Sequence, residues 1–322
     1  MSELLRVEAL KQHFTSGKGV FKSGYTVHAV DGVSFSINKG ETLGLVGESG
    51  CGKSTLGRSI LKLFEPTSGT VTFEGRDITD LPAKAFRSLR QEMQIIFQDP
   101  TESLNPRHTI GMILEEPFVI HNIGTPTQRK EWVDELLVKV GLSESASSKY
   151  PHEFSGGQKQ RIGIARAIAL KPKLIVCDES VSALDVSVQA QILNLLLKLQ
   201  QELDLTLIFI SHDLSVVRHI SDKVAVMYLG KIVEYGHAQS IYDSPKHPYT
   251  QALLSAIPIS HPRLRGKQRI FLTGDVPSPI NPPAGCRFYS RCSKAEKRCQ
   301  HREPKAITII DGKHDVACHL YD

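Results

Sequence analysis

Apolar positions follow two different periods along the chain, and their alternation predicts an α/β core. Residues 27–37 place apolar side chains at alternate positions, which is typical of a strand. Residues 186–203 instead place them on one helical face, at Ile192, Leu195, Leu196 and Leu199. Shorter apolar runs predict strands at residues 3–10, 42–46, 70–73, 93–97, 173–177, 205–210, 224–228 and 231–235. Strands that alternate with helices favour a largely parallel sheet, and the last two strands straddle Gly230 as a hairpin.

Two regions depart from this pattern. Prolines and asparagines punctuate residues 98–125, and helical patterns follow at residues 131–140 and 158–170. We therefore predict an inserted helical region. Beyond about residue 258 the prolines become dense and cysteines appear. This shift predicts a domain boundary at 258–265, with one domain over residues 1–257 and a second over 258–322.

Composition is ordinary for a globular protein with a sizeable core, because 40% of the 322 residues are hydrophobic and 23% are charged. No run approaches the ~20 apolar residues that span a bilayer, and the N-terminus lacks the pattern of a signal peptide. We expect a cytosolic protein that partners can hold at a membrane. Residues 261–302 carry ten Lys/Arg against two Asp/Glu. This basic stretch is either a solvated tail or a surface for an anionic group or lipid.

Residues 47–55 fit the phosphate-binding pattern G-x-x-x-x-G-K-[ST], between a predicted strand and a predicted helix over residues 56–63. They are Gly47, Glu48, Ser49, Gly50, Cys51, Gly52, Lys53, Ser54 and Thr55. The glycines let successive N–H groups face one cavity, and the helix start adds its positive dipole end. Lys53 can reach the outer phosphates and the Ser54 hydroxyl can bind Mg²⁺. The sequence predicts a nucleoside triphosphate site; a plain Gly-rich turn is the alternative.

Two further segments suit the same chemistry. Asp178 and Glu179 end an apolar strand; in phosphate-loop NTPases such an Asp holds Mg²⁺, and the adjacent Glu can polarise an attacking water. Residues 155–158, Ser-Gly-Gly-Gln, open a helix and offer a second anion site. Alone, each segment is also compatible with a helix cap or a solvent-facing charge. Two anion-binding helix starts in one chain suggest that two subunits share each nucleotide.

The order of these motifs resembles that of the ATP-binding subunit of an ATP-binding cassette (ABC) transporter. The resemblance covers residues 3–257, from the phosphate loop through Gln98, the segments at 155–158 and 178–179, and a Ser-Ala-Leu-Asp segment at 182–185, to His212. It implies an α/β fold with an ABC-type P-loop NTPase core and a mixed sheet. A helical subdomain is then inserted at about residues 100–170, and a small cysteine-rich extension follows the core.

The resemblance also implies the roles of individual residues. Glu179, His212 and Gln98 are expected to be catalytic. Glu179 would activate water, His212 would contact the γ-phosphate and this water, and Gln98 would couple the Mg²⁺ site to a transmembrane partner. Ser54, Gln98 and Asp178 are the expected Mg²⁺ ligands.

The same resemblance assigns residues to the dimer and to the base. A signature that caps the ATP of a partner subunit is expected from Ser155, Gly156, Gly157 and Gln158. Asp185 would line the dimer seam. The family stacks an aromatic side chain on adenine, and Phe14 fits by position, with Tyr25 as the alternative.

Six cysteines occur, and four of them lie near the C-terminus: Cys286, Cys292, Cys299 and Cys318. Thiolates serve zinc and iron–sulfur clusters alike. Close C-x₂₋₄-C pairs, common in zinc sites, are absent, whereas a 4Fe–4S cluster tolerates looser spacing. Neighbouring Arg and Lys side chains favour thiolates, and four reduced thiols are the remaining reading. Cys51 and Cys177 are expected to be small buried fillers.

Residues 247–254 and the prolines between 277 and 283 resemble the ATPases of dipeptide and oligopeptide importers, whose tails carry cysteines like these. This favours the 4Fe–4S cluster, with zinc as the alternative. It implies an ATPase, with ATP and Mg²⁺, that powers peptide import.

The expected partners are a homologous ATPase subunit, as a heterodimer or a homodimer in isolation, two transmembrane permease subunits and, indirectly, a solute-binding protein. No nucleic acid is expected, and the chain would sit peripherally on the cytoplasmic face of the membrane. Two alternatives are an importer of nickel, glutathione or another small solute, and a soluble ABC ATPase acting on ribosomes or nucleic acid.

Overall fold

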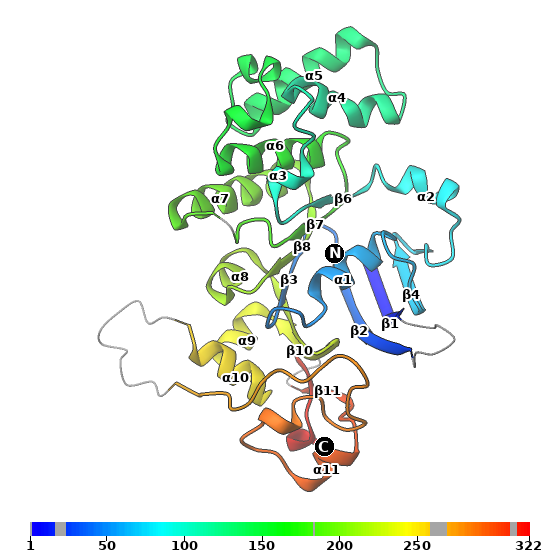
Figure 1. Ribbon diagram of the computed structural model, residues 1–322, viewed down its shortest axis with the longest axis vertical. Coiled ribbons are helices and arrows are strands. Elements are labelled where there is room, and N and C mark those ends of the chain that lie inside the picture. The colour runs from blue at the N-terminus through cyan, green and yellow to red at the C-terminus, as the bar shows by residue number, and fades with distance from the viewer. Residues whose placement is uncertain (1, 17–23, 183, 258–268, 310–313) are drawn as a thin grey trace. The chain divides into compact units, whose positions relative to one another are not determined.

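The computed structural model describes residues 2–16, 24–182, 184–257, 269–309 and 314–322 (Figure 1). The chain forms two compact units. The first unit combines Met1–Asp80 with Phe209–Asp322, and the second unit is Leu81–Ile208. The predicted boundary at 258–265 lies outside the described residues, so the two-domain division at residue 258 stays a prediction.

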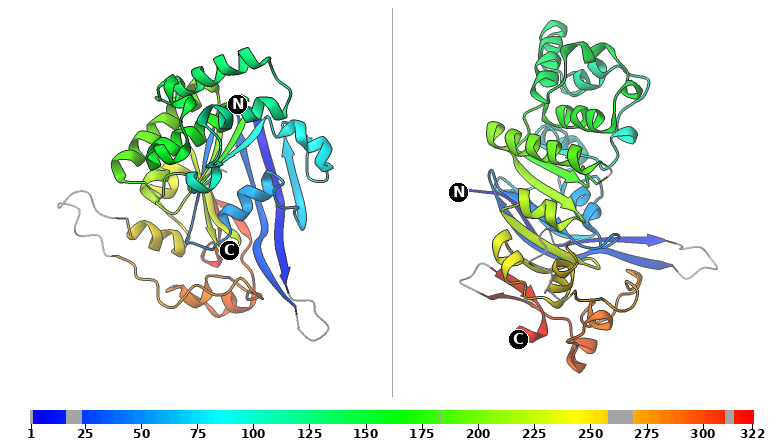
Figure 2. Two further views of the ribbon diagram at one scale, coloured as in Figure 1. Left: turned by 45° about the horizontal axis from the view of Figure 1, so that its top comes forward. Right: turned by 90° about the vertical axis from the view of Figure 1, so that its left-hand side faces the viewer.

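The first unit contains a four-stranded antiparallel sheet in the order β2-β1-β4-β5. Its strands are β1 (Glu3–Ser16), β2 (Tyr25–Asn38), β4 (Ser68–Phe73) and β5 (Arg76–Asp77). Figure 2 shows β1 and β2 as long blue strands that run side by side. Both strands extend beyond their predicted residues, because cross-strand pairing continues through polar residues such as Thr15 and Thr26. Bulges in β1 allow this by shifting its register.

A second set of strands in this unit mixes parallel and antiparallel pairing. Strand β3 (Thr42–Val46) pairs in parallel with β9 (Lys223–Tyr228), which forms the predicted hairpin with β10 (Lys231–His237). Strand β10 then pairs antiparallel with β12 (His314–Ala317), and β12 with β11 (Ala306–Ile309). The mixed sheet implied by the resemblance is confirmed, whereas a largely parallel sheet is wrong for these strands. The two C-terminal strands are only four residues long and gave no clear sequence signal.

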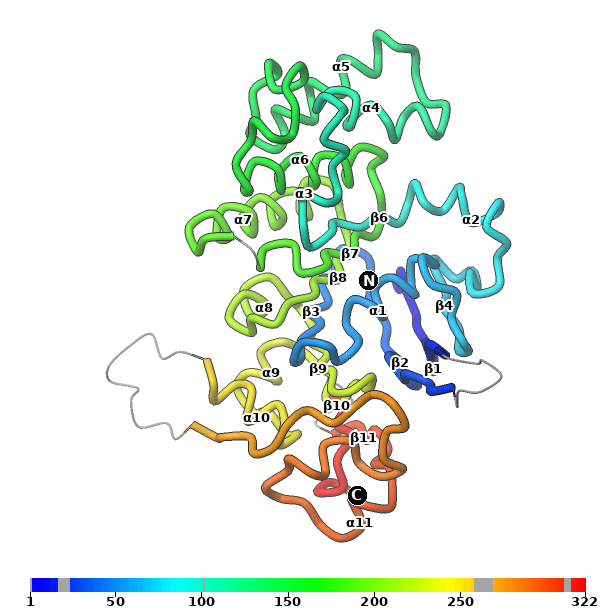
Figure 3. The backbone as a smooth tube through the Cα atoms, in the orientation of Figure 1, coloured from blue at the N-terminus to red at the C-terminus, as the bar shows by residue number. Residues whose placement is uncertain are grey.

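The helices of the first unit are short. They are α1 (Lys53–Ile60), α8 (Leu214–Ile220), α9 (Ala238–Asp243), α10 (Pro248–Ser255) and α11 (Lys297–His301). Short 3₁₀ turns occur at Tyr289–Arg291 and His319–Tyr321. We call residues 269–309 and 314–322 the C-terminal segment, which Figure 3 traces in orange and red as mostly irregular chain.

The second unit is mainly helical around a pair of parallel strands, β6 (Met93–Ile96) and β7 (Leu174–Asp178). Its helices are α2 (Ala83–Leu89), α3 (Pro100–Ser103), α4 (Ile110–Ile120), α5 (Pro126–Lys139), α6 (Gly156–Ile168) and α7 (Val186–Leu203), with 3₁₀ turns at Glu144–Ser148 and Pro151–Glu153. Helix α5 begins earlier than predicted because Thr125 and Gln128 form a capping box around Pro126. Strand β8 (Thr206–Ser211) contains the boundary with the first unit.

No helix among the described residues is long and apolar enough to cross a bilayer.

Candidate nucleotide-binding site

The phosphate loop connects β3, whose five residues are all buried, to α1, which begins at Lys53. Its first and last pattern glycines have positive φ, 153° at Gly47 and 105° at Gly52. A Cβ at Gly47 would overlap the carbonyl oxygen of Met227, and a Cβ at Gly52 would overlap that of Ala29. Glycine is therefore required at both positions, because the loop runs directly against β9 and β2.

Lys53 is folded into the loop, with only 4% of its surface exposed. Its Nζ donates to the carbonyl oxygens of Gly47 at 2.8 Å and Glu48 at 3.1 Å. Cys51 fills the space beside it, and burial raises the pKa of this thiol. The predicted filler roles of Cys51 and of the buried Cys177, whose pKa burial raises to about 12, agree with these positions. The ammonium is thus already held at the centre of the loop.

Residues far along the chain anchor the same loop. The backbone N–H of Glu48 donates to the hydroxyl of Tyr249 at 2.9 Å. The guanidinium of Arg291 grips the Glu48 carboxylate with two hydrogen bonds, of 2.6 and 3.0 Å. The backbone N–H of Gly230 donates to the Cys51 carbonyl at 2.8 Å. Sequence patterns did not identify the Arg291 contact, since no motif links positions 243 residues apart.

In the second unit, Ser155 caps the start of α6 as expected. Its Oγ accepts from the Gln158 N–H at 3.4 Å, while the Gln158 side chain accepts from the Ser155 N–H at 3.0 Å. Ser155, Gly156 and Gln158 are exposed, and a Cβ at Gly157 would overlap Val188. The glycine is therefore needed for close packing against α7, and the helix start remains accessible.

The ends of β6 and β7 bring Gln98 and Glu179 together. Glu179 follows Asp178, the buried last residue of β7, and has a φ of +47°. The Gln98 Nε2 donates to a Glu179 carboxylate oxygen at 3.1 Å. Residues after neighbouring parallel strands meet at one edge, so the pair follows from the strand order. An amide and two carboxylates at one edge offer oxygen ligands of the kind that Mg²⁺ takes.

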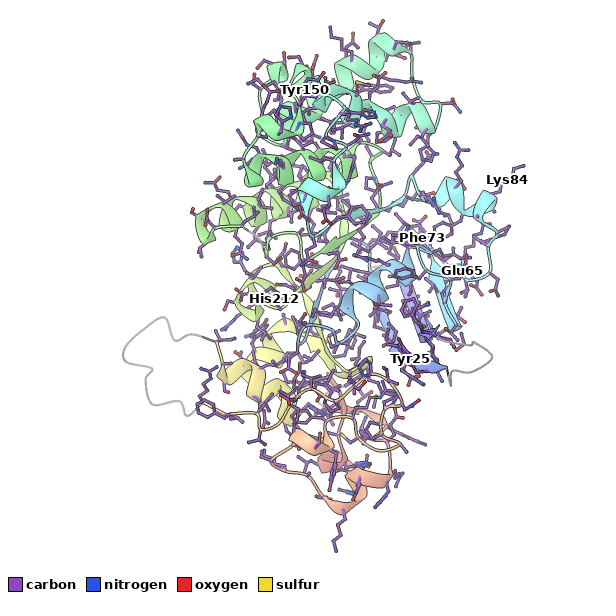
Figure 4. All side chains as sticks on the ribbon, viewed as in Figure 1. Tyr25, Glu65, Phe73, Lys84, Tyr150 and His212 are labelled. Atoms are coloured by element: carbon purple, nitrogen blue, oxygen red, sulfur yellow. The ribbon has the colours of Figure 1, made fainter. Side chains whose placement is uncertain are left out.

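The remaining predicted residues lie at the ends of elements. His212, labelled in Figure 4, directly follows β8, and Asp213 caps the next helix. Asp185 is the exposed residue at the start of α7. Phe14, near the end of β1, is 38% exposed and packs edge-on against Phe64. Tyr25, also labelled in Figure 4, opens β2 and is 46% exposed. Both aromatic rings are accessible, so the choice between them stays a prediction.

The four C-terminal cysteines are half-buried and are not joined by disulfides. Burial, and to a smaller extent the neighbouring Cys299, Cys318 and Cys292, raise the pKa of the Cys286 thiol to about 11. The backbone N–H of Cys286 also donates to the Cys299 carbonyl at 2.8 Å.

One other group has the residue types of a cation site. Ligand atoms of His13, His28 and Asp31 lie within 4.8 Å of one another. However, the guanidinium of Arg287 pairs with Asp31, and Lys11 lies 3.7 Å from it. Burial, the largest single effect, raises the pKa of the Asp31 carboxyl, but Arg287, Lys231 and His13 together outweigh it and lower this pKa to about 2. The carboxylate is thus already neutralised by protein cations.

Comparisons with known proteins agree with these features. Residues 30–182 match the ABC transporter family, and residues 233–299 match the C-terminal region of oligopeptide/dipeptide transporters. The chain is 54% identical to the oligopeptide transport ATP-binding protein AppF of Bacillus subtilis, over 99% of this chain and 97% of AppF. It is 51% identical to the dipeptide transport ATP-binding protein DppF of Haemophilus influenzae, over 98% of this chain and 97% of DppF.

Solved structures show the same fold. The chain is similar to cbiO1 of Clostridium perfringens, part of the ABC transporter complex cbiONQ, with a TM-score of 0.65, 30% identity and coverage of 76% of this chain and 92% of that one. A dimeric ATP-binding cassette bound to ADP and Pi also aligns with a TM-score of 0.65, at 27% identity over 73% of this chain and 99% of that one. Together with the phosphate loop and the near full-length identity, these matches establish that the chain belongs to the family of ABC-type ATPases that serve as ATP-binding proteins of oligopeptide and dipeptide transporters.

Proposed function

We propose that this ATPase powers the import of dipeptides or oligopeptides through a membrane ABC transporter. The observation that carries this proposal is the identity of 50% or more to peptide-transport ATP-binding proteins over nearly the whole chain. The match includes the C-terminal region, which distinguishes such proteins from cassettes that lack it. ATP hydrolysis follows from the family, and the peptide substrate is the part that needs a test.

The residue roles form the second part of the proposal. Lys53 would exchange the loop carbonyls that it now contacts for phosphate oxygens, which are stronger acceptors. Ser54, Gln98 and Asp178 would hold Mg²⁺, whose charge offsets that of the phosphates. Glu179 would take a proton from the attacking water, with its carboxylate oriented by Gln98. His212 would contact the γ-phosphate.

The exposed signature supports an assembly of two ATPase subunits. In this scheme the N–H groups of Ser155–Gln158, at the start of α6, do not bind the ATP held by the phosphate loop of the same chain. They would instead cap the ATP of a homologous partner subunit. Asp185 would line the seam. Two permease subunits would receive the resulting motion, and the chain would then lie peripherally on the cytoplasmic face of the membrane. In this scheme about residues 100–170, within the second unit, form the inserted helical subdomain.

The catalytic assignment is tested with Glu179→Gln in the assembled transporter. Loss of a general base lowers turnover by about 10²- to 10⁴-fold, while ATP binding is retained. Glu131→Gln, at an exposed position of α5, is the matched control and should hydrolyse ATP at the wild-type rate. Wild-type turnover by Glu179→Gln would refute the role of Glu179 but leave the transporter family unchanged.

The substrate is tested by reconstituting the chain with its co-purifying membrane subunits and solute-binding protein in proteoliposomes. ATP-dependent uptake of labelled peptides supports the proposal. Uptake of nickel or glutathione without uptake of peptides would show that the transported substrate is one of these solutes and not a peptide. ATPase activity stimulated by ribosomes or nucleic acid, without uptake, would favour a soluble ABC ATPase.

We further propose that Cys286, Cys292, Cys299 and Cys318 hold a 4Fe–4S cluster with a structural role. A single tetrahedral zinc ion keeps its sulfur ligands about 3.8 Å apart. Among the described residues, no three cysteines bring their sulfur atoms within 4.8 Å of one another. A four-iron cluster holds its thiolates further apart than one ion does.

Metal and sulfide analysis of anaerobically purified protein tests this cluster. The expected result is about four iron and four sulfide per chain, lost in Cys292→Ser and kept in Cys177→Ser. Stoichiometric zinc would favour the alternative of a zinc site. Absence of metal from both aerobic and anaerobic protein would indicate four reduced thiols without a metal.

A further inference from the structure

Arg291 connects the C-terminal segment to the phosphate loop. It is the last residue of the 3₁₀ turn Tyr289–Arg291, and its side chain is only 7% exposed. Both terminal nitrogens of its guanidinium donate to the Glu48 carboxylate, at 2.6 and 3.0 Å. This two-pronged geometry fixes the direction of both side chains, unlike a single contact from an ammonium group.

An aromatic cluster supports this pair. The Arg291 guanidinium lies 5.9 Å from the ring centre of Tyr228, which packs edge-on against Tyr249 and Phe288. The hydroxyl of Tyr249 accepts the backbone N–H of Glu48 at 2.9 Å. Glu48 is therefore held twice, through its backbone and through its carboxylate, by residues that follow position 228.

A second arginine of the C-terminal segment contacts the turn that supports the loop. Arg287 donates to the Leu229 carbonyl and pairs with Asp31. The next residue, Gly230, donates to the Cys51 carbonyl at 2.8 Å and accepts from the Asp31 N–H at 2.8 Å. The turn that supports the middle of the phosphate loop is thus fixed by the same segment.

The charge of Glu48 explains why such a contact matters for nucleotide binding. A carboxylate on a phosphate-binding loop repels the polyphosphate. Arg291 offsets that charge and fixes the carboxylate through two hydrogen bonds. The Glu48 carbonyl meanwhile contacts Lys53, so displacement of Glu48 would also displace the ammonium.

We propose that Arg291 is a positioning residue for ATP binding. Through Glu48 it holds the phosphate loop of its own chain, so that the C-terminal segment sets the affinity of the site for nucleotide. The side-chain hydrogen bonds of Arg291 go to Glu48, and the proposed function assigns the phosphates and the attacking water to other residues. Loss of Arg291 therefore acts on binding more than on the chemical step.

The test measures ATP affinity by calorimetry and steady-state hydrolysis in the full chain. Arg291→Gln is expected to raise the Kd and KM for ATP about tenfold, as loss of a charge-assisted contact does, with a smaller change in kcat. Arg291→Lys keeps the positive charge but cannot make the two parallel hydrogen bonds of the guanidinium. Its affinity for ATP should lie between those of Arg291→Gln and wild type. Arg6→Gln is the matched control, because Arg6 makes a similar two-pronged pair with Glu3 on the exposed surface of β1.

A double-mutant cycle with Glu48→Gln separates this role from general stability. Once Glu48 is neutral, Arg291→Gln should raise the Kd by less than about threefold, because the repulsion is gone. An equal loss in both backgrounds, or wild-type affinity in Arg291→Gln, would overturn the proposal. Melting temperatures identify any misfolded variant, and the cycle is then run with Arg291→Lys.

Discussion

Glu234, in β10, joins three parts of the first unit and provides a sharp test of its stability. The residue is 1% exposed. Its carboxylate accepts the backbone N–H groups of Lys246, at 2.7 Å, and His247, at 2.9 Å. It also accepts a hydrogen bond of 2.7 Å from Nε2 of His314, in β12. The start of α10 and the last strand of the chain therefore depend on one buried carboxylate.

The structure sets the magnitude expected for Glu234→Gln. The amide keeps one acceptor oxygen, but its NH₂ group faces a donor where the second oxygen stood. At least one charge-assisted hydrogen bond is lost, at about 1.5–3 kcal/mol, and a buried donor loses its partner at about 1–3 kcal/mol. The free energy of unfolding should therefore fall by about 3–5 kcal/mol, as for other broken buried pairs. In a unit of this size each kcal/mol lowers the Tm by ~2–4 °C.

The assay combines thermal unfolding with hydrogen exchange of the amides at residues 246 and 247, which report the lost acceptor directly. Glu65→Gln is the control, since Glu65 is an exposed carboxylate of the same unit, 77% exposed and 3.3 Å from Lys62 (Figure 4). The control should stay within about 0.5 kcal/mol of wild type. A Glu234→Gln variant that matches the control in both measurements would refute the reasoning.

Three further predictions concern single groups. Burial lowers the pKa of His247 to about 4, from an unfolded value of 6.5, so the stability that neutral His247 contributes is present above pH 6.5 and is lost as pH falls towards 4. In parallel urea titrations, the free energy of unfolding of wild type should fall by about 3 kcal/mol more than that of His247→Asn between pH 7 and pH 4. Identical pH profiles of the two proteins would contradict this prediction. Gly124 has a φ of +71°, and an added Cβ would lie 2.5 Å from the Trp132 ring. Gly124→Ala should therefore change the fluorescence emission of this single tryptophan and lower the free energy of unfolding by about 1–2 kcal/mol or more. An unchanged emission spectrum would argue against the contact. Gly52→Ala should lower the Tm more than Gly50→Ala, because both have positive φ but only Gly52 packs against a backbone oxygen of β2; equal shifts would show that backbone strain alone decides.

The motifs that predicted function were local, and this explains why they could be identified from sequence. The phosphate loop needs glycines and a lysine at fixed offsets because the backbone itself makes the cavity. The Ser155 cap and the position of Glu179 after β7 likewise follow from neighbours within a few residues. The pairing of Gln98 with Glu179 required one more step, the parallel pairing of β6 with β7.

The contacts that hold the site in shape were not predictable in this way. Arg291 and Glu48 are 243 residues apart, and Glu234 and His314 are 80 residues apart. An arginine among many in a basic stretch gives no signal that it pairs with a loop glutamate. From the sequence, the basic stretch was interpreted as a solvated tail or as a surface for an anionic partner. In the structure, two of its arginines, Arg287 and Arg291, pair with carboxylates of their own unit.

These long-range contacts bear on how the phosphate loop binds its ligand. Lys53 donates to two loop carbonyls, and Glu48 is fixed at its backbone by Tyr249 and at its carboxylate by Arg291. These contacts fix the loop backbone, and a loop that is already fixed loses less conformational entropy on binding a ligand. Because two of these anchors follow β10 in the chain, the match of residues 233–299 to the peptide-transporter C-terminal region covers residues that shape the ATP site itself.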